Sequence, residues 1–325
     1  MTAATVAERP AGALRRLVAD RPEIVLFAVF AALYLLTGAK EHGFLSGDQL
    51  STTVLFAAPL ALLAAGQTLV MLTGGIDLSV ANTATAAAYI MSAHGHKGVL
   101  ASVAIGLAIG LAVGLVNGVG VAVFGVQPLI MTLGMAAVTL GFLVVGAQTW
   151  FKHAPLVPEE IHTLGSERFF GYVPYNLLVW APIALAIILG LRYTGFGRMV
   201  YAVGDNREAC RLAGVRVWQV EIAVYVLCGV LSAIAGILVL GFNNAADLGL
   251  VVPFLLPSIA AVVIGGTSIF GGSGGYGGTI LGALILVVLD SLLTLLDASA
   301  AVKQMLYGGI VLGLAALYAR VASPE

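Results

Sequence analysis

Long runs of apolar residues recur along almost the whole chain, and they restrict its possible folds more than any other feature. A helix needs roughly 20 apolar residues to cross about 30 Å of hydrocarbon. Charged residues make up only 10% of the 325 residues and the mean hydropathy is +1.04, so a water-soluble fold could not bury this much apolar surface. The sequence therefore predicts an all-α polytopic membrane protein. About ten transmembrane helices are expected, at residues 23–39, 52–73, 78–93, 99–125, 128–149, 175–191, 219–241, 253–268, 276–296 and 303–320.

The distribution of basic residues predicts the orientation, because lysine and arginine are retained in short cytoplasmic loops. If the N-terminus is cytoplasmic and the ten spans alternate, ten of the 15 basic residues fall in inner segments and five in outer ones. Both termini are then cytoplasmic. We expect a cytoplasmic segment over residues 1–22, a single transmembrane domain over 23–320 and a cytoplasmic tail over 321–325. Segment 253–268 either spans the membrane or is re-entrant.

Gly74 and Gly75 interrupt the apolar pattern between the second and third spans, and Asp77 or Ser79 can then cap the next helix. Such a break at membrane depth is tolerated only where it borders protein or water, as in transport pathways. A cap and a pathway role are compatible. The polar residues in or beside the spans that are candidates for a solute pathway are Asp77, Ser79, Asn82, Thr85, Asn117, Thr132, Asn243 and Asn244.

Each of these residues also has a simpler explanation, since most polar side chains in membrane bundles form interhelical hydrogen bonds. Asp290 is less ordinary, because a carboxylate within a span is costly. A structural role near the outer end of its span is expected for Asp290. His94 and His96 lack the i, i+4 spacing of a helical metal pair, and no grouping of catalytic residues is visible, so neither a metal site nor a catalytic site is expected.

The inner loop at residues 192–218 is dense in charge, and within it a short amphipathic helix is expected to begin near Arg207. Asp205 or Asn206 would cap this helix and Gly214 would end it. The helix could dock into a groove on another protein, or it could be a solvated loop with incidental helicity. The residues that would carry the docking role are Asp205, Asn206, Arg207, Glu208, Ala209, Arg211, Leu212 and Gly214.

More than half of the residues in segment 264–278 are glycine, which predicts a tight inner turn with close backbone approaches. The segment contains no lysine, so it is a poor phosphate cradle. No GxxxxGK[ST] pattern occurs in the chain, and we therefore expect no ATP hydrolysis of the P-loop type. The glycines expected at hinges or close contacts are Gly74, Gly75, Gly265, Gly266, Gly271 and Gly272.

These segments, in this order, resemble the ribose-type branch of permeases from bacterial ATP-binding-cassette importers. The matching motifs are GGIDLSV at 74–80, QPLIMTLG at 127–134, VGDNREACRLAGV at 203–215 and IAAVVIGGTSIFGGSGG at 259–275. The resemblance extends over nearly the whole chain from about residue 24. One departure is that the acidic residues which often precede IAAVV in the family are replaced here by an apolar stretch, residues 254–257.

The resemblance implies a multi-pass subunit of the bacterial cytoplasmic membrane that forms the translocation pathway for a monosaccharide. It implies three kinds of partner: a second permease, which is another copy or a homologue; two ATPase subunits or one fused tandem ATPase; and an extracytoplasmic solute-binding protein. ATP and magnesium would bind to the ATPases, and residues 206–214 would be the helix that couples to them. A nucleoside or another small polar solute is an alternative cargo, and an ion-coupled secondary transporter is the alternative mechanism.

Overall fold

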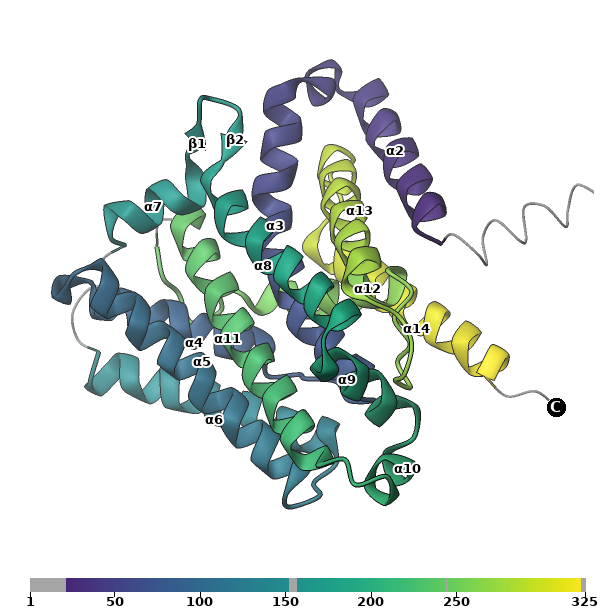
Figure 1. Ribbon diagram of the computed structural model, residues 1–325. Helices are drawn as coiled ribbons and strands as arrows, with labels where there is room; N and C mark the ends of the chain where they lie inside the picture. The colour runs from purple at the N-terminus through teal and green to yellow at the C-terminus, as the bar shows by residue number, and fades with distance from the viewer. Residues whose placement is uncertain (1–21, 152–156, 244, 323–325) are drawn as a thin grey trace, which may run out of the picture.

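The computed structural model describes residues 22–151, 157–243 and 245–322, and almost all of them lie in helices (Figure 1). Seven helices of the described ranges are long and apolar enough to cross a membrane. The predicted class, an all-α polytopic membrane protein, is therefore confirmed. The seven helices are α2 (Pro22–Lys40), α3 (Gly47–Leu72), α5 (Val99–Ala122), α6 (Pro128–Thr149), α8 (Tyr175–Tyr193), α11 (Val217–Asn243) and α13 (Tyr276–Leu295).

The other predicted spans also coincide with helices, but these are not all long enough to cross. Helix α4 has 14 residues and α12 has 10, whereas α14 has 23. Ten residues at 1.5 Å rise cover about half of the hydrocarbon thickness, which favours a re-entrant segment at 253–268. The bounds are α4 (Val80–Ala93), η3 (Val252–Phe254), α12 (Leu255–Ile264) and α14 (Ala300–Ala322).

The connections carry the remaining elements. Residues 157–174 form α7 (Glu159–Ser166) and a two-stranded antiparallel hairpin, β1 (Arg168–Phe169) and β2 (Val173–Pro174). This hairpin is a small departure from the expected all-helical chain. Between α8 and α11 the chain forms α9 and α10. The bounds of these and of the short 3-10 turns are α9 (Gly195–Asp205), α10 (Arg207–Leu212), η1 (His42–Leu45) and η2 (Gly95–Lys97).

Helix α3 forms the centre of the bundle. In its most apolar stretch 89% of the residues are buried, and it packs against α8, α11, α12 and α13. Helix α2, in contrast, lies at the edge beside α13 (Figure 1). In water a helix that is apolar all round would need complete burial. Here the outer helices leave leucine, isoleucine and phenylalanine side chains exposed, as lipid contact requires.

Glycines allow α5 and α11 to approach closely. Gly110 and Gly114 of α5 face Gly229 of α11, and a Cβ atom at Gly114 would lie 2.9 Å from the Cα atom of Val226. Small residues four positions apart serve this purpose in membrane helices, where van der Waals contact replaces the hydrophobic effect. Part of the high glycine content thus serves close helix packing at this interface.

Candidate functional site

The short helix expected in the inner loop is present as α10. Asn206 caps it, because its side chain accepts a hydrogen bond of 2.9 Å from the backbone N–H of Ala209. Gly214 ends it with a φ of +83°, a conformation that glycine adopts without strain. Of the two expected caps, Asp205 and Asn206, the structure shows the second. Helix α9, which precedes α10, was not predicted, since its mixed glycine and polar sequence resembles a loop.

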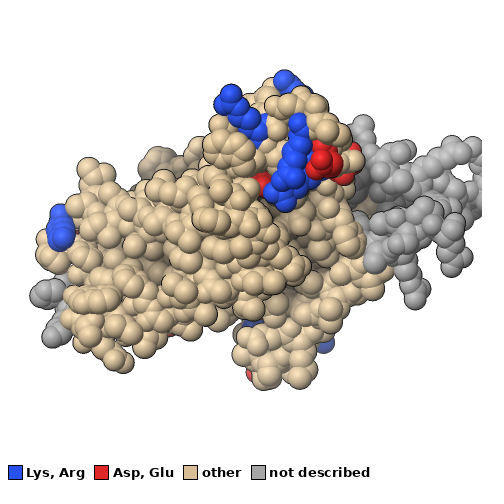
Figure 2. Space-filling model, turned by 90° about the horizontal axis from the view of Figure 1, so that it is seen from below, with Lys and Arg blue, Asp and Glu red and all other residues tan. Residues whose placement is uncertain are grey.

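The outward face of α10 combines an exposed leucine with charge. Leu212 is 82% exposed, and the exposed side chains of Glu208 and Arg211 lie 3.6 Å apart. Exposed basic residues on α9 and before α11, Arg198 and Arg216, lie on the same loop. Figure 2, viewed from below, shows most of the visible charged side chains gathered over one part of the surface, with a few others at its edges. An exposed pair contributes little stability, so this face is suited to contact with a partner rather than to holding the fold.

An ion pair attaches α10 to a long helix. The guanidinium of Arg207 donates a hydrogen bond of 2.7 Å to the carboxylate of Glu221, whose side chain is only 5% exposed. A buried carboxylate needs such a partner, because an unpaired charge in that position is strongly destabilising. Since Glu221 belongs to α11, this ion pair links α10 directly to that helix.

Three segments far apart in the sequence meet at Gly204, near the end of α9. A Cβ atom at Gly204 would collide with the carbonyl oxygen of Leu72 at the end of α3, and it would lie 2.6 Å from the backbone nitrogen of Gly272. The N–H of Gly272 donates to the same Leu72 oxygen at 3.0 Å. Tyr201 of α9 donates its hydroxyl to the carbonyl of Gly274 at 2.9 Å, and burial raises the pKa of this tyrosine. We call this meeting point the glycine junction (residues 72–74, 201–205 and 271–274).

The glycine-rich turn contains several residues in the left-handed region of backbone conformation. Gly266, Gly271 and Gly272 all have positive φ, and Gly74 of the preceding break does as well. Gly265 packs against the start of α13, where a Cβ atom would lie 2.5 Å from the carbonyl carbon of Gly278. These contacts agree with close packing. A hinge motion at these glycines stays a prediction.

The break between α3 and α4 is held by a buried polar network. The Asp77 carboxylate accepts hydrogen bonds from the N–H and the hydroxyl of Ser79, at 2.8 and 2.6 Å. Asn117 donates to the Ser79 hydroxyl at 2.9 Å, and the Gln67 side chain pairs with both backbone groups of Asp77. All four residues are at most 2% exposed. Asp77 thus fixes the residues just before α4 by binding Ser79, while Ser79, at the cap position, makes no side-chain cap bond to the helix. Gly75 lies next to the Tyr225 hydroxyl.

The remaining pathway candidates bind different partners. Thr132 is buried and accepts the N–H of Leu78 at 3.1 Å, so it supports the same break. Asn82 donates to the carbonyl of Ala136 at 3.0 Å. Thr85 accepts the N–H of Val251 at 3.1 Å, and Asn243 is exposed at the end of α11. Asn244 lies outside the described residues. Contact of these residues with a solute stays a prediction.

The sequence matches the family described as "Branched-chain amino acid transport system / permease component" over residues 49–315. The chain belongs to this permease family. The Ribose import permease protein RbsC of Escherichia coli strain K12 is 36% identical over 79% of this chain and 81% of its own length. The Autoinducer 2 import system permease protein LsrC of Salmonella paratyphi B is 32% identical over 92% of this chain and 86% of its own length. A probable ABC transporter permease, y4mJ of Sinorhizobium fredii, is 31% identical over 93% of this chain. No solved structure matches the chain.

Membership settles the broad role of the chain. Permeases of this family are transport components of ABC importers, located in the inner membrane with several spans, and are not ATPases themselves. They act with ATPase subunits, which use ATP and magnesium, and with a solute-binding protein. The expectations of a multi-pass permease without its own ATPase activity are confirmed.

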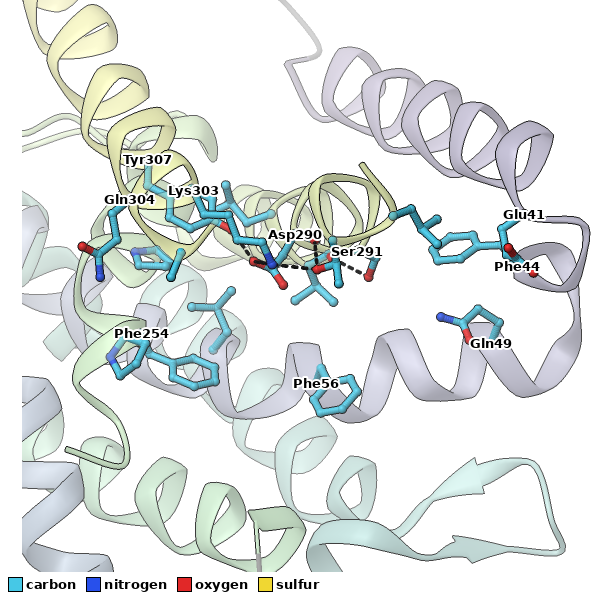
Figure 3. A pocket seen from close by; sticks show the side chains of 18 of the residues that line it. Glu41, Phe44, Gln49, Phe56, Phe254, Asp290, Ser291, Lys303, Gln304 and Tyr307 are labelled. Atoms are coloured by element: carbon cyan, nitrogen blue, oxygen red, sulfur yellow. Dashed lines mark hydrogen bonds and ion pairs between the residues drawn. The ribbon is translucent and has the colours of Figure 1, made fainter. Parts of the chain in front are cut away.

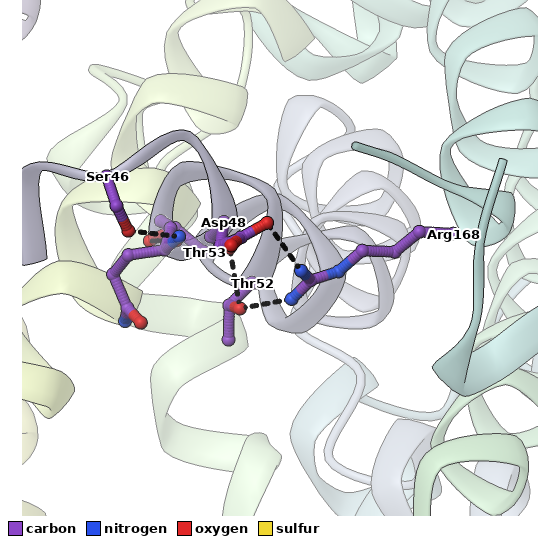
Figure 4. Close-up of polar contacts among 6 residues, drawn as sticks. Ser46, Asp48, Thr52, Thr53 and Arg168 are labelled. Atoms are coloured by element: carbon purple, nitrogen blue, oxygen red, sulfur yellow. Dashed lines mark hydrogen bonds and ion pairs between the residues drawn. The ribbon is translucent and has the colours of Figure 1, made fainter. Parts of the chain in front are cut away.

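The end of the molecule that carries the hairpin contains contacts that the sequence did not reveal. Arg168 of the hairpin donates to Thr52 at 2.6 Å and pairs with Asp48 at 3.3 Å, so the hairpin is fastened to the first turns of α3 (Figure 4). The two partners are about 120 residues apart, and no local spacing signals such a contact. Gln67 was also missed. The sequence signal that could have indicated a role for Gln67 is a single amide side chain within an apolar run.

Proposed function

We propose that this permease forms the translocation pathway for a monosaccharide in an importer with two ATPase subunits, or one fused tandem ATPase, and a second permease. The second permease would be another copy of this chain or a homologue, and an external binding protein would deliver the sugar. Support comes from relatives that import ribose and autoinducer 2. The observation that carries the proposal is α10, a capped helix with an exposed leucine on a chain that lacks a P-loop.

In the proposed mechanism, α10 inserts into a groove on an ATPase, and its displacement is transmitted along two routes. One route is the ion pair from Arg207 to Glu221 on α11. The other is the glycine junction, through which α9 contacts the end of α3 and the turn before α13. Packed helices shift between discrete arrangements rather than deform continuously, so a small movement of α9 and α10 can tilt α3, α11 and α13 together.

The mechanism does not need a coupling ion. A secondary transporter requires acids that face an ion or a water-filled path. The Asp77 carboxylate, however, is buried and accepts both hydrogen bonds from Ser79 at the break. Asp77 is therefore not available as a site for a coupling ion.

Reconstitution tests the proposal. The permease is purified with the ATPase subunits encoded beside it, placed in proteoliposomes with enclosed ATP or without it, and given the neighbouring binding protein loaded with radioactive D-ribose, D-xylose or D-galactose. We expect ATP-dependent uptake of one sugar in the absence of any sodium or proton gradient. Uptake without ATP, or uptake that requires an ion gradient, would contradict the mechanism. Transport of only a nucleoside or another non-sugar solute would contradict the assignment of the cargo.

A further inference from the structure

A cavity of about 690 Å³ opens in the outer half of the permease, where α13 turns into α14. Its walls come from η1, the first turns of α3, η3, α12, the end of α13 and the start of α14 (Figure 3). Small-ligand sites usually occupy roughly 300–1,000 Å³ and combine an apolar lining with a few placed polar groups. In size this cavity falls within that range.

One wall of the cavity carries a cluster of polar groups. The Asp290 Oδ1 atom accepts the Tyr307 hydroxyl at 2.8 Å and pairs with the Lys303 ammonium at 3.0 Å. The same ammonium donates to Thr294 at 2.6 Å. Among the described residues the contacts of this carboxylate all go to Oδ1, which leaves Oδ2 without a hydrogen-bond partner on a residue that lines the cavity. The amide of Gln304 lies beside this cluster in the lining and is exposed.

Aromatic rings lie across from this cluster. Phe56 and Phe254 line the opposite side of the cavity in Figure 3, and Phe56 is 42% exposed although the ring of Phe242 supports it edge-on at 5.2 Å. Phe254 lies in the apolar stretch that replaces the acidic residues often found before IAAVV in the family. A ring surface on one side and charged hydrogen-bonding groups on the other suit a molecule with an apolar C–H face and a rim of hydroxyls.

A contact with lipid explains the cluster poorly. Ionisable residues within membrane segments almost always face a bundle interior or a water-filled cavity, because the charge is costly in hydrocarbon. A purely internal ion pair would bury both groups, yet the Asp290 side chain is 48% exposed at the cavity. The partly open carboxylate and the exposed Gln304 amide therefore indicate an aqueous space that a polar solute can enter.

We propose that this cavity is an outer binding pocket for the monosaccharide, in which Asp290, Lys303 and Gln304 bind hydroxyl groups and Phe56 and Phe254 pack against the ring. The pocket receives the sugar from the binding protein before it passes inward. This assignment rests on the proposed function. It also gives Asp290 a role in solute contact, beyond the structural role that its sequence position predicts.

Labelling tests whether the pocket is aqueous and occupied by sugar. Ser291, which lines the cavity, is changed to cysteine, and the assembled importer is treated with a charged, membrane-impermeant methanethiosulfonate. The native Cys210 and Cys228 are buried, so the wild type serves as the blank. Tyr172→Cys, on the exposed hairpin, is the matched control outside the cavity. We expect the sugar that the wild type transports to slow labelling of Ser291→Cys about tenfold and to leave Tyr172→Cys unchanged.

Uptake measurements provide the second test. Asp290→Asn and Gln304→Leu should each lower the uptake rate, by about tenfold for Asp290→Asn because a hydrogen bond to a charged group is lost. Asp297→Asn, also near the outer end of α13 but outside the cavity, should transport normally. The Gln304 side chain makes no hydrogen bond within the described residues, so we expect its variant to keep the fold even if Asp290→Asn does not assemble.

The outcomes separate the two proposals. Three results would contradict the pocket assignment: normal uptake in both pocket variants, labelling that no sugar slows, or reaction of Ser291→Cys only with membrane-permeant N-ethylmaleimide. In each case, sugar uptake by the wild type would still support the proposed function. Absence of sugar transport by the wild-type importer would overturn both.

Discussion

At the scale of single residues, the glycine junction is the most constrained point of the inner side. Gly204 has backbone atoms of α3 and of the glycine-rich turn where a side chain would start. Backbone cannot move aside as the end of a flexible side chain can, so any larger residue must displace α9. Because α9 leads directly into α10, the permease cannot change this residue without moving its proposed docking helix.

We therefore expect Gly204→Ala to be damaging. Overpacking of a filled site costs roughly 1–3 kcal/mol, which should lower the melting temperature of the detergent-purified permease and reduce ATP-dependent uptake. Gly195→Ala is the matched control in the same helix, since the nearest atom to its Cβ would be a side-chain nitrogen of Arg198 at 3.8 Å. Equal melting temperatures and equal uptake for the two variants would contradict the role of the junction.

Single residues also show what the sequence can and cannot reveal. The cap at Asn206 and the stop at Gly214 were predictable, because both depend on neighbours within a few positions. The role of Gln67 was not, since its partner Asp77 is reached only after the chain has broken and turned. The pairing of Arg168 with Asp48 likewise depends on how the helices pack.

At the scale of elements, α10 is too short to be stable alone, since isolated helices of fewer than about 12 residues are marginal in water. Its six residues are held by the Asn206 cap, by the Arg207–Glu221 ion pair and by the buried side chain of Cys210. The contacts on one side fix the helix, while Leu212 points away from them and remains exposed. An element built in this way can be altered on its outer face without loss of the fold.

Leu212→Asp should consequently uncouple the permease from its ATPase. A central apolar anchor of an interface typically accounts for 2 kcal/mol or more, so we expect about a thirtyfold weaker association. Copurification of the ATPase with tagged permease from membranes measures this effect. Leu100→Asp is a suitable control, because Leu100 is 83% exposed at the start of α5, far from α10 in the chain.

Membrane levels of both variants should match the wild type. Glu208→Ala tests the acidic side chain on the exposed face of α10, and Gly214→Val tests the residue that ends the helix. Both variants should weaken association with the ATPase. Undiminished copurification with Leu212→Asp would remove the docking role from α10, whatever the result for the other two.

At the scale of the whole molecule, the apolar runs predicted the helices well because each long span is defined by its own sequence. Where the prediction was incomplete, the missing information lies in the tertiary contacts between helices. Residues 253–268 are as apolar as a span, yet α12 has only 10 residues and is preceded only by the short 3-10 helix η3. Such backbone is tolerated at depth only when other helices cover it, as the bond from Val251 to Thr85 shows. The hydropathy of a segment does not indicate whether other helices pack over it.

The orientation of the bundle is the remaining prediction at this scale. Elements α7 and the β-hairpin lie at one end of the molecule, and α9 and α10 lie at the other (Figure 1). Residues 192–218, which include α9 and α10, carry five arginines, whereas the described part of the loop with α7 carries one lysine or arginine, Arg168. Because basic loops are retained in the cytoplasm, the end with α10 should face the cytoplasm, where an ATPase can reach it.

Reporter fusions measure this directly. Alkaline phosphatase folds only outside the cytoplasm, so a fusion after Glu160 should be active and a fusion after Asp205 inactive, and green fluorescent protein should give the opposite pattern. Expression levels of the fusions, compared by immunoblot, control for unstable chains. The reversed pattern would place α10 outside the cell, away from ATP, and the coupling mechanism would then fail together with the topology.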